Sequence, residues 1–164
     1  MTSRLAILCV EDEPPVRDAL VRDLEPFAPQ VVTETAESVE DARIALEELR
    51  ASGEHIALVL ADHLLPGQTG VDFLVELHAD PTSARAKKVL VTGQAGLEDT
   101  IAAVNRADLD RYVAKPWSPE DLRAVVRDLL TDYVIEHLDD VLPYLPVLDG
   151  PRLLEAHARR SGDR

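Results

Sequence analysis

Several features that would assign a chain to a particular class of protein are scarce in this sequence of 164 residues. Cys9 is the only cysteine, which excludes an internal disulfide and fits a reducing compartment, so we expect a cytoplasmic protein. No window approaches the roughly twenty unbroken apolar residues of a membrane helix. The short apolar run near the N-terminus passes directly into acidic residues, which argues against a signal peptide.

Positive charge is also scarce, with 17 Lys and Arg against 31 Asp and Glu and a formal net charge of -14. Nucleic acids and anionic membranes attract proteins through clustered Lys and Arg. We therefore expect no direct DNA binding and no membrane association. A carboxylate-rich chain is better suited to divalent cations or basic partners, although a solvated acidic surface explains most of these residues equally well.

Short apolar runs alternate with longer amphipathic stretches along the chain. The runs predict five strands, the second of them weaker and placed at an edge: Leu5–Val10, Gln30–Thr35, Ile56–Ala61, Lys88–Thr92 and Arg111–Ala114. The stretches predict helices after Pro14-Pro15, over Ser38–Arg50, Gly70–His78 and Leu97–Arg106, and from Ser118 onward. This alternation is typical of an α/β fold with a doubly wound parallel sheet covered by helices on both faces.

Polar side chains gather where the predicted strands end. In an open parallel sheet, ligands bind outside the carboxyl ends of the strands. Glu11 and Asp12 follow the first strand, Asp62 the third, Thr92 ends the fourth, and Lys115 lies near the end of the fifth. These groups are therefore expected at one rim of the sheet.

This set of side chains suits phosphoryl chemistry. Converging carboxylates need a cation or raised pKa values, and a hard, oxygen-rich cluster suits Mg²⁺. Lys115 can neutralise a phosphate oxygen, Thr92 can form a hydrogen bond with one, and an aspartate can be the nucleophile that becomes an acyl phosphate. No single one of these groups identifies phosphoryl chemistry, but their joint position at successive strand ends does.

Four segments carry a resemblance to a known family: VEDEP at Val10–Pro14, LADHLLPGQTG at Leu60–Gly70, LVTG at Leu90–Gly93 and RYVAKPW at Arg111–Trp117. In these segments the chain resembles the receiver domains of two-component response regulators. The resemblance covers residues 4–130 and implies a flavodoxin-like strand order of 2-1-3-4-5. It leaves residues 131–164 as a helical extension.

The resemblance also implies roles for individual residues. Asp62 corresponds to the phosphoacceptor. The expected ligands of Mg²⁺, with Mn²⁺ as a possible substitute, are Glu11, Asp12, Asp62 and the backbone carbonyl of Leu64. Thr92 and Lys115 correspond to the groups that contact the phosphoryl group, and Thr92 and Tyr112 to the conformational switch. The Lys115-Pro116 peptide bond is expected to be cis.

A histidine kinase or phosphotransfer protein is the phosphodonor that the resemblance implies, and the output is through protein–protein interaction. The chain is then a signalling switch rather than an enzyme, with self-dephosphorylation as its only catalysis. Two positions depart from the family pattern. Glu11 stands where aspartate is more usual, and Leu64 should influence how water reaches the acyl phosphate, which leaves the phosphoryl lifetime open.

Other interpretations remain for the whole chain and for its single residues. The chain could be the receiver portion of a larger regulator, or a pseudo-receiver that works without phosphorylation. An aspartyl-nucleophile phosphohydrolase is disfavoured, because Leu64 stands where such enzymes carry a second aspartate. Taken singly, Asp62 is also typical of a turn, the acids after the first strand could cap a helix, and Tyr112 could serve packing alone.

Beyond the receiver, helical spacing of apolar residues continues to Leu145. Pro143 and Pro146 break this helix, and Gly150-Pro151 starts a last amphipathic piece. Several turns beyond the sheet should not be buried by the receiver alone. We therefore expect residues 131–164 to dimerise the chain or to dock a partner. The alternative is that the extension folds back as an extra helix on its own receiver.

Overall fold

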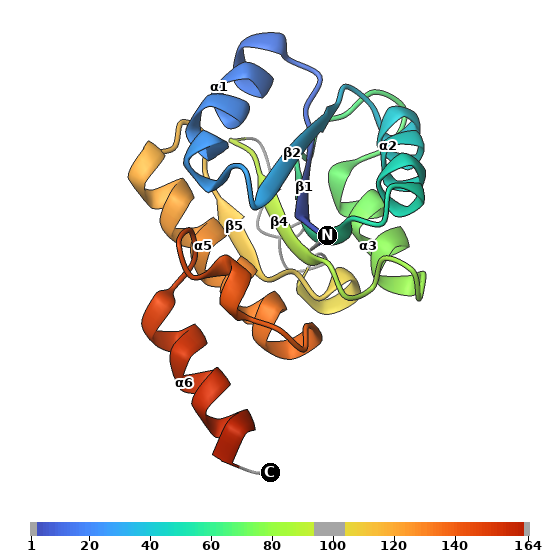
Figure 1. Ribbon diagram of the computed structural model, residues 1–164. Helices are drawn as coiled ribbons and strands as arrows, with labels where there is room; N and C mark the ends of the chain where they lie inside the picture. The colour runs from blue at the N-terminus through green and yellow to red at the C-terminus, as the bar shows by residue number, and fades with distance from the viewer. Residues whose placement is uncertain (1–2, 94–103, 163–164) are drawn as a thin grey trace.

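The computed structural model describes residues 3–93 and 104–162 (Figure 1). Its five strands form one parallel sheet in the order β2-β1-β3-β4-β5. The strands are β1 Leu5–Val10, β2 Val31–Ala36, β3 His55–Ala61, β4 Lys87–Val91 and β5 Arg111–Val113. The sequence-based prediction of the fold class and strand order is therefore confirmed, and β2 lies at an edge as expected.

Helices cover both faces of this sheet, with α1 and α5 on one face and α2 and α3 on the other (Figure 1). Their bounds are α1 Pro14–Leu24, α2 Val39–Ala51, α3 Gly70–Ala79, α5 Pro119–His137 and α6 Gly150–Gly162, with short 3-10 turns η1 Glu25–Phe27 and η2 Leu142–Tyr144. Of the helix expected over Leu97–Arg106, residues 104–106 are helical and the rest lies outside the described residues. No described helix is both long and apolar enough to cross a membrane.

Local sequence explains where the helices begin. The side chains of Ser38, Thr69 and Ser118 each accept a hydrogen bond from the backbone N–H three positions further on, at the starts of α2, α3 and α5. These bonds satisfy N–H groups that have no partner within the helix. Capping thus fixes where α3 and α5 begin, directly after the loops that carry Asp62 and Lys115.

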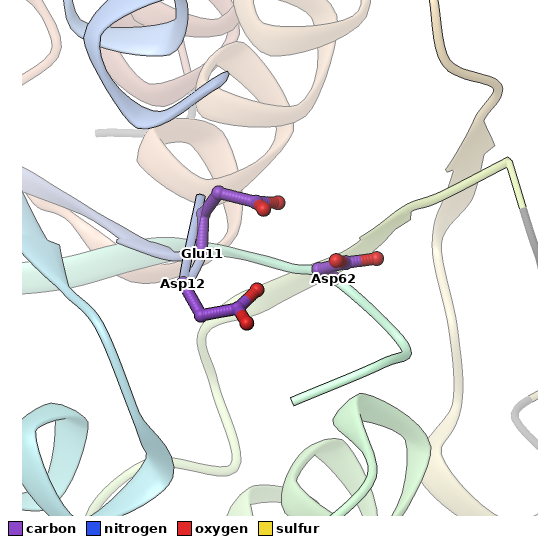
Figure 2. Close-up of side chains that lie close together, drawn as sticks. All are labelled: Glu11, Asp12 and Asp62. Atoms are coloured by element: carbon purple, nitrogen blue, oxygen red, sulfur yellow. The ribbon is translucent and has the colours of Figure 1, made fainter. Parts of the chain in front are cut away.

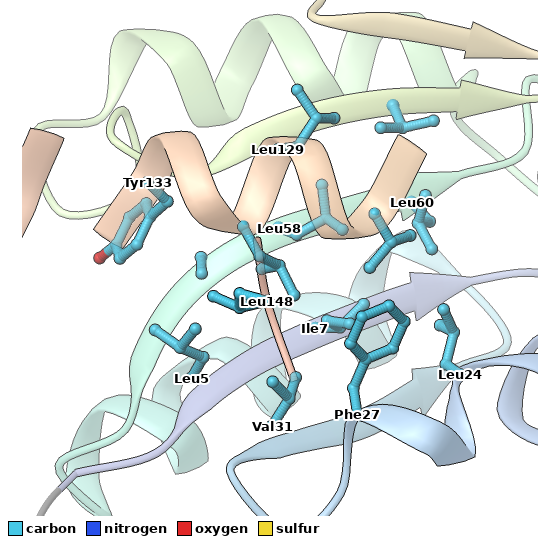
Figure 3. Packing of buried hydrophobic residues seen from close by; sticks show 14 of the residues in the cluster. Leu5, Ile7, Leu24, Phe27, Val31, Leu58, Leu60, Leu129, Tyr133 and Leu148 are labelled. Atoms are coloured by element: carbon cyan, nitrogen blue, oxygen red, sulfur yellow. The ribbon is translucent and has the colours of Figure 1, made fainter. Parts of the chain in front are cut away.

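The central strand β1 divides the core into two halves. Leu5, Ile7 and Cys9 pack with α1 and α5, whereas the alternate residues Ala6 and Leu8 pack with α2 and α3. Figure 3 shows Leu5 and Ile7 in the first of these two halves. Every residue of β1 is buried, as the absence of polar alternation in the sequence predicted. The strand ends that carry the polar residues are consequently held by apolar packing on both sides.

The extension differs from the sequence-based expectation. Helix α5 ends at His137, and the chain then turns through η2 before it enters α6, instead of continuing as one helix to Leu145. The apolar cluster that contains Leu5 of β1 also buries Val134 and Val141 from the predicted stripe, together with Tyr144, Leu148 and Leu153. Figure 3 shows Leu148 among these core side chains. The expectation that the receiver alone cannot bury these residues was therefore wrong, because the turn after α5 brings them back onto its own sheet and helix.

Polar contacts fasten the extension as well. The Tyr144 hydroxyl donates to the backbone carbonyl of Ser3 at 2.8 Å. The Arg160 guanidinium donates to the carbonyls of Ile135, Leu138 and Asp139 at 2.6–2.9 Å. Carbonyls at a helix C-terminus have no partner within the helix and attract cations. Arg160 on α6 thus caps the end of α5.

The packing of α6 predicts opposite outcomes for two adjacent leucines. Leu153 is 0 % exposed and Leu154 is 52 % exposed. Leu153→Ala should lower the free energy of unfolding by about 2–4 kcal/mol, because it leaves a cavity in the core. Leu154→Ala should change it by less than about 0.5 kcal/mol. Urea denaturation of both variants measures the difference, and equal stabilities would show that α6 does not pack as described.

Candidate functional site

Parallel pairing brings the acidic residues together. Val10 of β1 is in register with Ala61 of β3, so the residues that follow these two strands leave the sheet side by side. The Asp62 N–H donates to the Val10 carbonyl at 3.0 Å. Carboxylate oxygens of Glu11, Asp12 and Asp62 all lie within 4.8 Å of one another, and Figure 2 shows them facing the same space beyond the strand ends.

Two of the three carboxylates are buried, and this decides the electrostatics of the site. Glu11 is 1 % and Asp62 5 % exposed, whereas Asp12 is exposed to solvent. Burial raises the pKa of Glu11, and the charge of Asp62 raises it further, although the hydrogen bond from Lys115 opposes the shift. A cation placed among these groups would relieve the cost of keeping them ionised.

Lys115 supplies a positive charge to this cluster from the end of β5. Its Nζ lies 2.8 Å from Glu11 Oε2 and 3.2 Å from Asp62 Oδ2. Burial by itself would lower the pKa of Lys115, but the hydrogen bonds and charges of the two carboxylates outweigh burial and raise it. The ammonium is therefore charged at neutral pH. The Lys115-Pro116 bond is cis, as the family resemblance implied.

Thr92 connects the site to β5. It is buried next to the cleft, and its N–H donates to the Val113 carbonyl at 3.1 Å. The Tyr112 hydroxyl donates to the Thr92 carbonyl at 2.8 Å. Two hydrogen bonds thus join the predicted phosphate-binding threonine to the strand that carries the predicted switch tyrosine.

Gly70 holds the loop after β3 close to the site, a function that the sequence did not reveal. A Cβ at this position would lie 1.9 Å from the Asp62 carbonyl oxygen, so no other residue fits without moving the backbone. The Gly70 N–H donates to the His63 carbonyl at 2.9 Å. The only signal in the sequence was the position of this glycine after the turn at Pro66-Gly67.

A cleft of about 820 Å³ runs from the acidic cluster along α1. The side chains of Leu64 and Lys115 line one part of it, and Trp117 lines another. The Trp117 indole N–H donates to Asp23 Oδ2 at 2.8 Å, and Asp23 is buried on α1. No signal in the sequence indicated this pairing of α1 with the loop after β5.

The residues present fit a divalent cation and a phosphoryl group. Glu11, Asp12 and Asp62 offer the hard oxygen ligands that Mg²⁺ prefers. Lys115 and Thr92 border the same cleft and can contact phosphoryl oxygens. Of the residues predicted from the sequence, these five therefore lie together. Tyr112 contacts Thr92 from outside, and Leu64 lines the cleft, while a role for its carbonyl as a ligand stays a prediction.

Comparison with known proteins agrees with this geometry. Over 122 residues the chain is 36% identical to the hydrogenase transcriptional regulatory protein HoxA of Cupriavidus necator, and the match covers 74% of the chain but 23% of HoxA. It is 29% identical to a CheY-like response regulator receiver domain protein from Methanospirillum hungatei JF-1, with a TM-score of 0.70 over 82% of this chain and 99% of that one.

A third similar structure is the receiver domain of the sensor histidine kinase PA1611 from Pseudomonas aeruginosa PAO1, solved with a magnesium ion coordinated in its active site cleft. It is 20% identical, with a TM-score of 0.64 over 78% of this chain and 98% of that one, which shows the shared fold. The family model for the response regulator receiver domain matches residues 7–127. The chain therefore belongs to the response regulator receiver domain family of two-component signal transduction.

Proposed function

We propose that Asp62 accepts a phosphoryl group from a phosphohistidine of a histidine kinase or phosphotransfer protein. An Asp62 oxygen attacks phosphorus, the bond from phosphorus to the histidine nitrogen breaks, and an acyl phosphate forms. The observation that carries this proposal is the convergence of Asp62 with two further carboxylates and the Lys115 ammonium at the strand ends. An acid that only formed a turn would not need these partners.

Glu11, Asp12, Asp62 and the backbone carbonyl of Leu64 would hold Mg²⁺, with Mn²⁺ as a possible substitute. The ion supplies positive charge that offsets the repulsion between the carboxylates and the phosphoryl oxygens. The carboxylate cluster supports this assignment, as does the magnesium ion described in the cleft of the structurally similar PA1611 receiver.

Lys115 and Thr92 would stabilise the charge of the transferring group. Lys115 already contacts Asp62, so its ammonium needs to exchange only the Glu11 contact for a phosphoryl oxygen. Thr92 would move toward the new dianion and, through its two hydrogen bonds with Tyr112 and Val113, would pull β5 with it. Tyr112 would then follow, and the surface around β5 would change.

Hydrolysis of the acyl phosphate by water would reset the switch, and this self-dephosphorylation is the only catalysis that we propose. The exposed Leu64 side chain lines the cleft and would limit the approach of water to Asp62. Output would occur through protein–protein interaction in the cytoplasm. The alternative of a phosphorylation-independent interaction module requires that the acidic cluster stay unused.

The wider context of this receiver is also a proposal. Because the chain spans less than a quarter of the length of HoxA, it aligns with only one part of that transcriptional regulator. The chain could thus act alone or as the receiver portion of a larger regulator. The chain has a net charge of -14, and its sequence predicts no DNA-binding motif. We therefore propose that these residues do not bind DNA directly.

The outward face of the extension is our candidate for docking a second copy or another protein. Helix α6 extends away from the sheet (Figure 1). Leu154 on this helix is half exposed. Because the inward face of α6 is part of the core, removal of the whole extension would also damage folding. A substitution on the outer face is therefore the better test of assembly.

Phosphorylation is tested by incubation with acetyl phosphate and Mg²⁺. Intact mass should increase by one phosphoryl group in the parent protein and stay unchanged in Asp62→Asn, because an amide cannot form the acyl phosphate. Asp72→Asn, which changes an exposed carboxyl on α3, serves as a control and should be phosphorylated like the parent. An adduct that persists in Asp62→Asn would refute the assignment.

Metal binding is tested by thermal unfolding with and without MgCl₂. Binding to the native state should raise stability by about 2.7 kcal/mol at about 100 times the Kd. Asp12→Asn should abolish this increase and should stabilise the metal-free protein, because one of three neighbouring carboxylates no longer repels the others. Glu47→Gln on the exposed face of α2 should retain the response to Mg²⁺; a response equal in all three proteins would argue against this site.

Assembly is tested by sedimentation equilibrium of the parent, Leu154→Glu and Ile44→Glu. If α6 mediates dimerisation, the parent and the Ile44 variant should have the molar mass of a dimer and Leu154→Glu that of a monomer. Ile44 is a suitable control because it is 53% exposed, like Leu154 at 52%, but lies on α2. A parent that stays monomeric with and without acetyl phosphate would exclude dimerisation through this face.

A further inference from the structure

The carboxylate of Asp128 on α5 contacts both β5, the strand that carries Tyr112, and the C-terminal helix α6. Asp128 Oδ2 accepts from Arg111 Nη2 of β5 at 2.9 Å, and Asp128 Oδ1 accepts from Arg152 Nη1 of α6 at 2.9 Å. The two arginines carry the same charge and share one partner. Each arginine binds its own oxygen of Asp128 and the two positive charges repel each other, so release of one arginine would strengthen the interaction of the carboxylate with the other.

Arg111 is tied to the phosphorylation site by its position in the chain. It precedes Tyr112, whose hydroxyl donates to the Thr92 carbonyl, and Val113 of the same strand accepts from the Thr92 N–H. Strand β5 is only three residues long, so a shift of Thr92 acts on all of it. A continuous set of contacts thus leads from the site to Asp128.

Arg152 holds the start of α6 on α5. It also forms an ion pair with Asp132 one turn further along α5, and it lies next to the buried Leu153. Arg160 binds the end of α5 at the opposite end of α6. Arg152 therefore fastens the N-terminal half of α6, where the helix leaves the core.

We propose that phosphorylation of Asp62 tightens the docking of α6 on α5, because Arg111 and Arg152 compete for Asp128. When Thr92 moves toward the phosphoryl group, β5 shifts and Arg111 releases Asp128. The carboxylate then interacts with Arg152 alone, without a second arginine beside it. This inference rests on the proposed function of Asp62 and makes the C-terminal helix an internal sensor of the state of that residue.

The expected size of the coupling is modest, because the groups are partly exposed. Ion pairs of this kind change a local equilibrium by about twofold. Amide hydrogen exchange measures the opening of a helix directly, since protection follows the local opening equilibrium. Exchange of residues 150–162, followed by mass spectrometry, is therefore the suitable readout.

The experiment compares exchange with and without beryllofluoride and Mg²⁺, a stable substitute for the phosphoryl group. In the parent protein, protection of residues 150–162 should rise about twofold. In Arg111→Ala, protection should already be raised without the ligand and should not rise further. Arg43→Ala is the matched control, because the Arg43–Glu76 ion pair has side chains 49% and 43% exposed, against 50% and 43% for Arg111–Asp128.

Trp117 lines the cleft, so its fluorescence reports separately whether beryllofluoride binds. If beryllofluoride binds but the protection of residues 150–162 does not change, or changes equally in the parent and in Arg111→Ala, the coupling is refuted. The proposed function stands in that case. If the ligand does not bind, the proposed function fails and the phosphorylation step of the coupling fails with it. The competition itself is then decided by the ligand-free comparison, since unchanged protection in Arg111→Ala excludes it.

Discussion

The ammonium group of Lys115 lies 2.8 Å from an oxygen of Glu11 and 3.2 Å from an oxygen of Asp62. Without this charge, two buried carboxylates would repel each other with no opposing cation, and the pKa of Glu11, which burial already raises, would rise further. Glu11 and Asp62 follow the paired strands β1 and β3, and Lys115 follows β5, which is joined to β3 through β4. The pairing of the parallel strands therefore determines where the charged groups of the site lie.

Much of the fold could be predicted from the sequence, because a central parallel strand must be apolar on both faces. Residues 5–10 and 56–61 met that condition, and their lengths excluded helices. The packing of the extension was harder to predict. Helical spacing indicates that residues such as Val134 and Val141 form an apolar stripe, but not which surface buries them. The turn after His137 made that surface the chain's own receiver.

The candidate site was predictable for a related reason, since residues after parallel strands meet at one rim whatever lies between them. Glu11, Asp62 and Lys115 come from three strands and were expected together on that basis. Contacts that depend on side-chain reach were not predictable. Asp23 of α1 is buried and accepts a hydrogen bond from the Trp117 indole, a contact between distant segments that no pattern in the sequence indicated.

The extension also divides into two parts of different local stability. Tyr144 and Leu148 belong to the receiver core and can be exposed only when that core opens, whereas much of α6 contacts solvent and is fastened by Leu153, Arg152 and Arg160. Helices with few buried contacts open without global unfolding. A weak signal, comparable to one partly exposed ion pair, can therefore change the docking of α6 while leaving the sheet and the Asp62 site intact.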